Sequence, residues 1–278
     1  MNRAVPPTGI VFDPGILARD LQLDLVLRRS AVIVAVLAIG AVVYLDRVGS
    51  TAGFALVVLL VVGWMWMNSI SAGVWRSLPG VTAMIGRDPE SAEAGLAELM
   101  RRRPLVPWVR LLLYHRLAAI RHQQQRFGES AAICRELLNR SLGPVRKVRG
   151  ALLLMLAEAS LQCRDLYGAY SALSGLRREK LSVAERLQWL ALQTRYEVLV
   201  GSDQAVLSGI RQKLLWSELM PADHCGAVHA MMYVAARRAG KTQLADWLYR
   251  RSELLCDPTR LQRLLHSGFA IRVVGPPQ

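Results

Sequence analysis

Two long apolar runs stand out in the N-terminal quarter of the chain and predict membrane-spanning helices. The first covers residues 30–45, the second covers residues 48–75, and only Asp46 and Arg47 interrupt them. At about 1.5 Å per residue the first run spans ~24 Å, and extension back to Leu25 would match a bilayer core of ~30 Å. A core helix of a soluble protein, which is the alternative, rarely continues this far without a charge. The pattern therefore predicts a two-helix transmembrane hairpin.

The residues that flank the two runs predict the orientation of the hairpin. Aromatic residues prefer the membrane interface, near the ends of membrane helices. Four aromatic residues lie toward the ends of the two runs: Tyr44, Trp64, Trp66 and Trp75. Arginines precede the first run and follow the second, and the connecting loop offers only one, beside an aspartate: Arg19, Arg28, Arg29, Arg76, Arg87 and Arg47. The positive-inside bias then places both termini on the cytoplasmic side, and we expect an integral protein of a bacterial inner membrane.

A cleavable signal peptide is the other interpretation of the first run. The stretch before it is about thirty residues long and contains three aspartates, and no A-x-A-like site follows before Asp46, which argues against cleavage. Neither run contains an ionisable side chain, and Asn68 is the only strongly polar one. Because transport pathways need ionisable groups or broken helices at membrane depth, the pattern favours an anchor over a transporter.

Downstream of the apolar runs the periodicity predicts an all-α domain. Apolar residues recur at spacings of three and four, without persuasive strand alternation. Asp88-Pro89-Glu90 has the composition of a helix start, with a capping Asp and Pro at the first helical position. Breaks are expected at Arg103-Pro104, Gly128, Gly143-Pro144, Leu181-Ser182, Gly201-Ser202, Met220-Pro221 and Gly240. These breaks predict about nine helices joined by short turns.

These elements divide the chain into five segments. We expect a partly amphipathic cytoplasmic segment over residues 1–29, the transmembrane hairpin over 30–75 and a linker with Pro and Gly over 76–90. A helical-repeat domain would follow over residues 91–270, with a C-terminal tail over 271–278.

Small residues at similar positions after successive breaks indicate an internal repeat. The anchors are Ala131, Ala169, Ala205 and Ala245, separated by 38, 36 and 40 residues. A period near this value predicts stacked helical hairpins, none of which buries its apolar face alone.

Residues at the same positions resemble the tetratricopeptide-repeat family, whose units have about 34 residues. Trp189, Leu192 and Tyr196 match the pattern of that family's first helix, with Ala205 as the small residue of the second helix. The other matching positions are Leu156, Ala169, Gly240, Ala245, Tyr249 and Pro258. The resemblance implies an α-solenoid of about four hairpins, with a concave surface that binds a protein or peptide and no catalytic activity.

The repeat domain is strongly basic. The chain carries a net charge of +14, and five Arg and four Asp in the first 75 residues leave +13 for the remainder. The basic residues most expected at the surface are Arg101, Arg102, Arg103, Arg177, Arg178, Arg237 and Arg238. Such a surface would attract anionic lipid headgroups or an acidic protein partner, although solvated helix ends would look similar. Nucleic acid is the least favoured partner, because the sequence has no array of stacking aromatic residues.

Three groups of residues resemble parts of catalytic or metal sites, and none has the full set that such a site needs. Gly240-Lys241-Thr242 lacks the upstream glycine of a phosphate-binding loop, since Ala235 stands in its place. Cys225 and His229 share a helix face, but a zinc site needs more ligands than distant Cys256 and His224 provide. The third group is His115, His122, Glu129 and Glu136, which shows no sign of a cleft. We therefore predict no catalytic, cofactor-binding or metal-binding residue, and four reduced cysteines.

Together these features predict a non-enzymatic scaffold or adaptor that presents a basic helical-repeat domain on the cytoplasmic face of a membrane. The alternative is a structural or accessory subunit of a larger membrane complex, in which the hairpin packs against other helices.

Overall fold

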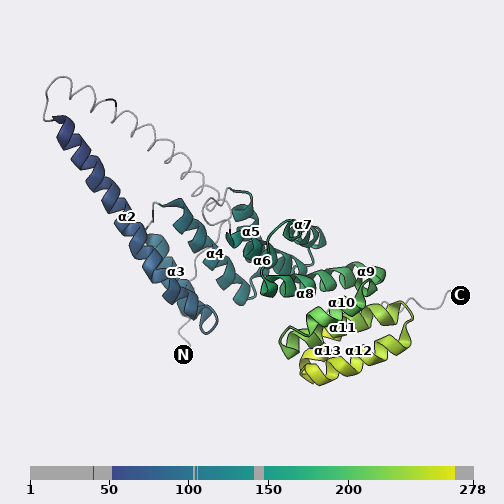
Figure 1. The fold of residues 1–278 in the computed structure, drawn as a ribbon. Coiled ribbons are helices and arrows are strands. Elements are labelled where there is room, and N and C mark those ends of the chain that lie inside the picture. The colour runs from purple at the N-terminus through teal and green to yellow at the C-terminus, as the bar shows by residue number, and fades with distance from the viewer. Residues whose placement is uncertain (1–39, 41–51, 103, 105, 141–146, 267–278) are drawn as a thin grey trace, which may run out of the picture. The chain divides into compact units, whose positions relative to one another are not determined.

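The computed structural model describes residues 40, 52–102, 104, 106–140 and 147–266, and the regular structure in these residues is helical (Figure 1). This confirms the predicted all-α class for the part of the chain that the structure describes. The described part contains twelve helices: α2 (Ala52–Met84), α3 (Pro89–Arg101), α4 (Pro107–Gln123), α5 (Phe127–Leu138), α6 (Arg149–Gln162), α7 (Leu166–Leu176), α8 (Val183–Val200), α9 (Asp203–Leu207), α10 (Ile210–Ser217), α11 (Ala222–Arg238), α12 (Thr242–Leu255) and α13 (Pro258–His266).

The chain forms two compact units, Met1–Met155 and Leu156–Gln278, and α6 crosses the division. In the first unit α2 packs against α3 and α4, α3 against α4, and α4 against α5. In the second unit α8 contacts α7, α9, α10 and α11, while α11 also packs against α12 and α13. Packing between helices that are neighbours in the sequence is typical of repeat proteins, and the arrangement is repeat-like in this sense.

Helix α2 runs through the segment that the sequence predicted to be a linker. It continues to Met84 with Pro79 inside it, although proline removes one helical hydrogen bond and costs ~3 kcal/mol in an isolated helix. Packing compensates, because Val74, Leu78 and Val81 are buried in a helix that lies against α3 and α4. The approach of α2 to α3 is close, since a Cβ added at Gly95 would lie 3.3 Å from Val81 Cγ2. Local composition does not show this packing, because it depends on which helix the segment contacts.

The earlier part of α2 is apolar and exposed. In the described part of the chain one helical stretch, Val58–Met84, is long and apolar enough to cross a membrane. Its most apolar segment has a mean hydropathy of 1.4, and 12% of that segment is buried. Leu59, Trp64 and Trp66 are 64–74% exposed. By length and composition this stretch fits a membrane anchor or a signal sequence. The first predicted run, at residues 30–45, lies outside the described residues except for Gly40, so the two-helix hairpin stays a prediction.

Four turns with the same backbone geometry join the two helices of successive hairpins. A residue with positive φ follows α4, α6, α8 and α11, with values between 59° and 79°: Gln125, Arg164, Gly201 and Gly240. In each turn the next N–H donates to the carbonyl five residues back at 2.8–2.9 Å, and the positive-φ residue donates to the carbonyl three residues back. These two bonds define the Schellman ending of a helix. The turns recur after 39, 37 and 39 residues and set the period of the repeat.

These turns also correct the register of the small residues in the second helices. In each turn the residue after the one with positive φ donates the hydrogen bond to the carbonyl five residues back. The residue four positions after this donor is buried in every hairpin: Ser130, Ala169, Val206 and Ala245. Ala169 and Ala245 hold the predicted positions, but Ala205 is exposed and Val206, which is fully buried, replaces it. The position is occupied by Ser130 rather than Ala131 in the first hairpin, where Ser130 Oγ donates to the Ala118 carbonyl at 3.0 Å. Matching alanines misled the alignment because the buried position tolerates serine and valine.

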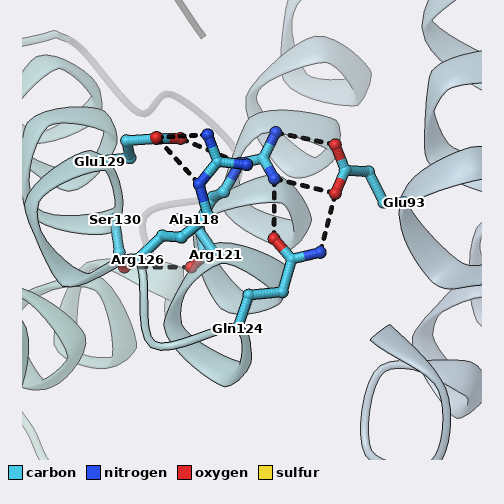
Figure 2. A network of polar contacts seen from close by, with 7 residues as sticks. All are labelled: Glu93, Ala118, Arg121, Gln124, Arg126, Glu129 and Ser130. Atoms are coloured by element: carbon cyan, nitrogen blue, oxygen red, sulfur yellow. Dashed lines mark hydrogen bonds and ion pairs between the residues drawn. The ribbon is translucent and has the colours of Figure 1, made fainter. Parts of the chain in front are cut away.

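A buried polar network holds together α3, α4 and α5 in the first unit (Figure 2). The Arg121 side chain is fully buried and donates two hydrogen bonds of 2.8 Å to the Glu93 carboxylate. Its Nε lies 3.1 Å from Glu129 Oε2, and Gln124 accepts from Arg121 and donates to Glu93. Arg126 pairs with the other oxygen of Glu129. Because a buried charge is costly unless it is paired, these partners allow an arginine to occupy a core position.

The network predicts a large cost for removing Arg121 alone. We expect Arg121→Leu to lower the free energy of unfolding by about 3–5 kcal/mol, because Glu93 would keep a buried charge without its partner. The double variant Arg121→Leu/Glu93→Leu should recover most of this loss. Arg126→Leu, which removes a partly exposed pair, should cost less than about 1 kcal/mol. Denaturant unfolding of the full-length protein in detergent, followed by circular dichroism, measures all three, and equal losses for Arg121→Leu and Arg126→Leu would contradict the prediction.

The left-handed turns predict opposite effects at two glycines. Gly201→Ala places a side chain at a φ of 79° and should cost ~1 kcal/mol, which lowers the thermal midpoint by about 2–4 °C. Gly128 lies in the first turn of α5, and a Cβ there meets no atom within 4 Å. Gly128→Ala is therefore the matched control and should leave the midpoint unchanged or raise it. Thermal unfolding of the two variants and the wild type measures both effects. An unchanged thermal midpoint in Gly201→Ala would refute the assignment of the turn.

Candidate functional site

A groove of about 540 Å³ opens within the second unit. Its walls come from the end of α7 and the connection to α8, from one face of α8, and from the turn and helix that follow α9. The lining residues are Leu176, Arg177, Glu179, Leu181, Arg186, Trp189, Leu190, Gln193, Glu197, Ser208, Gly209, Gln212, Lys213 and Trp216. Its volume lies in the range of ligand-binding clefts.

The groove forms where the third hairpin departs from the regular repeat. In the other hairpins the second helix is continuous for 11–14 residues, whereas here it stops after the five residues of α9 and restarts as α10. Ser208 is extended and Gly209 has a φ of 64°, so the backbone changes direction between the two helices. Two residues of this break, Ser208 and Gly209, line the groove.

Lys213 holds this break in place. Its Nζ donates to the carbonyls of Ala205 and Val206 at 2.7 and 3.0 Å, and these carbonyls belong to the last turn of α9. The same Nζ lies 3.3 Å from Glu197 on α8. A cation at a helix C-terminus complements the partial negative charge of the helix end. One lysine therefore ties α8, α9 and α10 together at the base of the groove.

The groove combines aromatic walls with a basic rim. Trp189 and Trp216 are half-buried, and Trp189 Nε1 is a buried donor without a hydrogen-bond partner among the described residues. Lys213 and Glu197 neutralise each other, while Arg177 and Arg186 are exposed and make no ion pair or hydrogen bond with residues that the structure describes. Arg178 and Lys180 add positive charge beside Arg177. Glu179 is the remaining acid of the lining, so the rim is positively charged.

The predicted repeat-packing residues divide into core and groove positions. Leu156, Ala169, Leu192 and Ala245 are buried, as the packing role requires. The aromatic residues are only half-buried: Trp189 lines the groove, Tyr196 lies 6.0 Å from Tyr170, and Tyr249 lies 5.2 Å from Tyr233 by ring centroids. Gly240 is the turn residue with a φ of 70°.

The predicted basic surface also divides. Arg101 and Arg102 are exposed and lie within 4.0 Å of Glu98, and Arg103 lies outside the described residues. Arg177 and Arg178 are exposed at the groove, and Arg237 donates to the Tyr233 hydroxyl. Arg238 has a structural role instead, since its Nη1 donates to the Val198 carbonyl at 2.9 Å and lies 3.7 Å from Asp203. It thus connects α11 to α8 and α9.

Sequence reasoning missed Gly209, Lys213 and Trp216 as groove residues. The dipeptide Ser208-Gly209 is a turn signal that could have indicated the break in the second helix. No local signal marks Lys213, because its partners belong to α8 and α9 and only the folded chain brings them together.

Cys225 and His229 of α11 lie in a buried cluster rather than in an open site. His229 Nε2 lies 3.1 Å from Ser217 Oγ and 3.7 Å from Cys225 Sγ, and both partners are buried. Cys256 Sγ lies 3.4 Å from the Asp223 carbonyl, whereas His224 is exposed. In the described residues, no group of three or more His, Cys, Asp or Glu side chains is placed to hold a metal ion.

The polar residues of the first hairpin take separate roles. His115 is buried and Glu129 belongs to the Arg121 network. Glu136 pairs with Arg140 at 2.8 Å, and His122 stacks edge-on against Phe127. The structure does not bring these four side chains together at a cleft.

Comparisons with protein-family models, curated proteins and solved structures give no match to the chain. The repeat-like arrangement therefore rests on the helices and turns of this structure.

Two buried histidines predict that the fold weakens under mild acid. Burial lowers the pKa of both His115 and His229 to about 4, and the positive charges of Arg116 and Arg251 add to the effect. In the unfolded chain the histidine pKa is near 6.5, so between pH 6.5 and 4 the unfolded state binds protons that the folded state does not bind. The free energy of unfolding is therefore highest above pH 6.5 and falls as the pH drops toward 4. Each histidine should contribute a loss of about 2 kcal/mol between pH 7.5 and 5.

Unfolding at several pH values checks this prediction. His229→Leu should remove roughly half of the loss of stability between pH 7.5 and 5, because it removes one of the two buried histidines. The variant leaves no unpaired hydroxyl, since Ser217 Oγ keeps its bond to the Leu214 carbonyl. His224→Leu is the control on the same helix and should leave the pH dependence as it is. An unchanged slope in His229→Leu would refute the assignment.

Proposed function

We propose that the protein is a membrane-anchored, non-enzymatic adaptor whose second unit binds an acidic segment of a protein partner in the groove between α7, α8 and α10. The observation that carries this proposal is the pair of tryptophans, Trp189 and Trp216, below a rim of arginines without partners among the described residues. We also propose a relation to the tetratricopeptide-repeat class, because the hairpins share one turn geometry and a small or β-branched residue in the second helix.

The composition of the groove favours a peptide over a substrate. Tryptophan and arginine are the residue types most enriched among energetically dominant contacts of protein interfaces. The groove can accept one large apolar side chain beside Trp189 and Trp216. Acidic residues on either side would meet Arg177 and Arg186, which favours association through charge complementarity.

Support for the anchor comes from α2. Its exposed apolar stretch has the length and composition of a membrane span, and residues 48–75 contain no charged side chain. The proposal also includes a further membrane helix at residues 30–45, which precedes α2 in the chain. It includes a cytoplasmic orientation and a location in a bacterial inner membrane as well. In this arrangement the adaptor would hold its partner at the membrane surface.

Peptide binding to the full-length protein in detergent tests the proposal. The probe is a fluorescein-labelled peptide of Asp and Glu with one central Phe, compared with peptides that have Lys for the acids or Ala for the Phe. We expect binding of the first peptide only, and Arg186→Glu should weaken it about tenfold or more, as measured by fluorescence anisotropy.

Arg250→Glu is the matched control, because Arg250 is exposed on α12 and does not line the groove. It changes the net charge equally and should leave the affinity within about twofold. Equal binding of all three peptides would show non-specific adsorption, and equal loss in both variants would show that only the overall charge attracts the probe. Such a result would overturn the groove as the binding site.

A further inference from the structure

A second cleft, of about 370 Å³, lies inside the first unit between α2 and α4. It is lined by Trp75, Leu78, Pro79, Thr82, Ala83, Leu112 and Arg116. The five residues from α2 follow the spacing i, i+3, i+4, i+7 and i+8, so they form one stripe along the helix. No acidic side chain belongs to this lining in the described part of the chain.

The only charge in the cleft is an arginine without a partner among the described residues. Arg116 is half-buried, and its Nε is a buried donor with no hydrogen-bond partner there. Desolvation by burial lowers the pKa of Arg116. A guanidinium nevertheless stays charged in proteins, and a buried donor that is left unpaired is destabilising. By contrast, Arg121 one turn further along α4 has its full set of partners.

The cleft is continuous with the apolar helix that would cross the membrane. Residues 52–75 of α2 extend ~36 Å at 1.5 Å per residue, enough to span a core of ~30 Å with some tilt. Trp75 is 47% exposed and packs edge-on against Trp108 with ring centroids 5.0 Å apart. Tryptophans prefer the interface between hydrocarbon and headgroups, and Arg76, the next residue, is the first charge after the apolar run. The stripe from Trp75 to Ala83 therefore falls at the depth of the headgroups.

We propose that this cleft binds the phosphate headgroup of one anionic phospholipid, with Arg116 as the ligand of the phosphate. The proposal rests on the membrane anchor proposed above. The phosphate would face the guanidinium of Arg116, which lines the cleft, and an arginine fork matches phosphate oxygens in geometry and charge. The acyl chains would continue along the same face of α2, where Val61 and Trp64 are exposed. One bound lipid would thus fill the cleft and fix α4 against the membrane surface.

Native mass spectrometry of the full-length protein released from nanodiscs tests this site. The nanodiscs contain phosphatidylglycerol and phosphatidylcholine with the same acyl chains. We expect one phosphatidylglycerol to remain on the wild type and no phosphatidylcholine. Arg116→Gln should reduce the retained phosphatidylglycerol at least tenfold. Ala83→Trp, which fills the cleft without changing the charge, should do the same. Arg250→Gln is the control for net charge and should keep the lipid.

Three outcomes would overturn the site: equal retention in all variants, equal loss in Arg250→Gln, or displacement of the lipid by inorganic phosphate, which would indicate a soluble anion as the ligand. Extraction of the wild type and Arg116→Gln from membranes with alkaline carbonate separates this proposal from the anchor. Both proteins should stay in the membrane fraction if the anchor is correct. Release of the wild type would instead refute the anchor, whereas loss of the lipid site alone leaves both anchor and peptide groove intact.

Discussion

The left-handed turn between the helices of each hairpin is the constraint on which the repeat depends. Each turn satisfies helix-end carbonyls through two backbone hydrogen bonds, so it requires a backbone conformation and no particular side chain. The conformation fixes where the second helix begins and therefore which residue meets the first helix four positions later. This explains why Ser130, Ala169, Val206 and Ala245 occupy equivalent buried positions although their side chains differ.

Both proposed sites lie where the regular packing is interrupted. In the second unit the break between α9 and α10 opens a groove, and Lys213 stabilises the break through two carbonyls and Glu197. In the first unit Pro79 lies on the stripe of α2 that faces α4, and the cleft beside it contains Arg116. A continuous solenoid would bury these faces against the next helix. In the second unit, the irregularity within the repeat therefore leaves a groove between the helices.

Helix α2 changes the expected connection between the membrane anchor and the first unit. A linker would leave that unit free to move, whereas a helix that packs against α3 and α4 holds it directly beside the apolar stretch. The Arg121 network strengthens the same unit by joining α3, α4 and α5 (Figure 2). Together these contacts join the first unit to the proposed anchor through packed helices.

The sequence by itself determined the helical class, the approximate period and the helix boundaries that local chemistry controls. Asp88 caps α3, Ser182 begins α8, and Gly201 and Gly240 end their helices, because capping and positive φ depend on residues that are close in the chain. The tertiary structure alone decided that Gln125 and Arg164 adopt the same turn and that Pro79 stays helical. It also decided that Val206 rather than Ala205 is buried, and it brought Lys213 and Trp216 to Trp189. These outcomes depend on packing between distant segments, and that energy outweighs a local preference of ~1–3 kcal/mol.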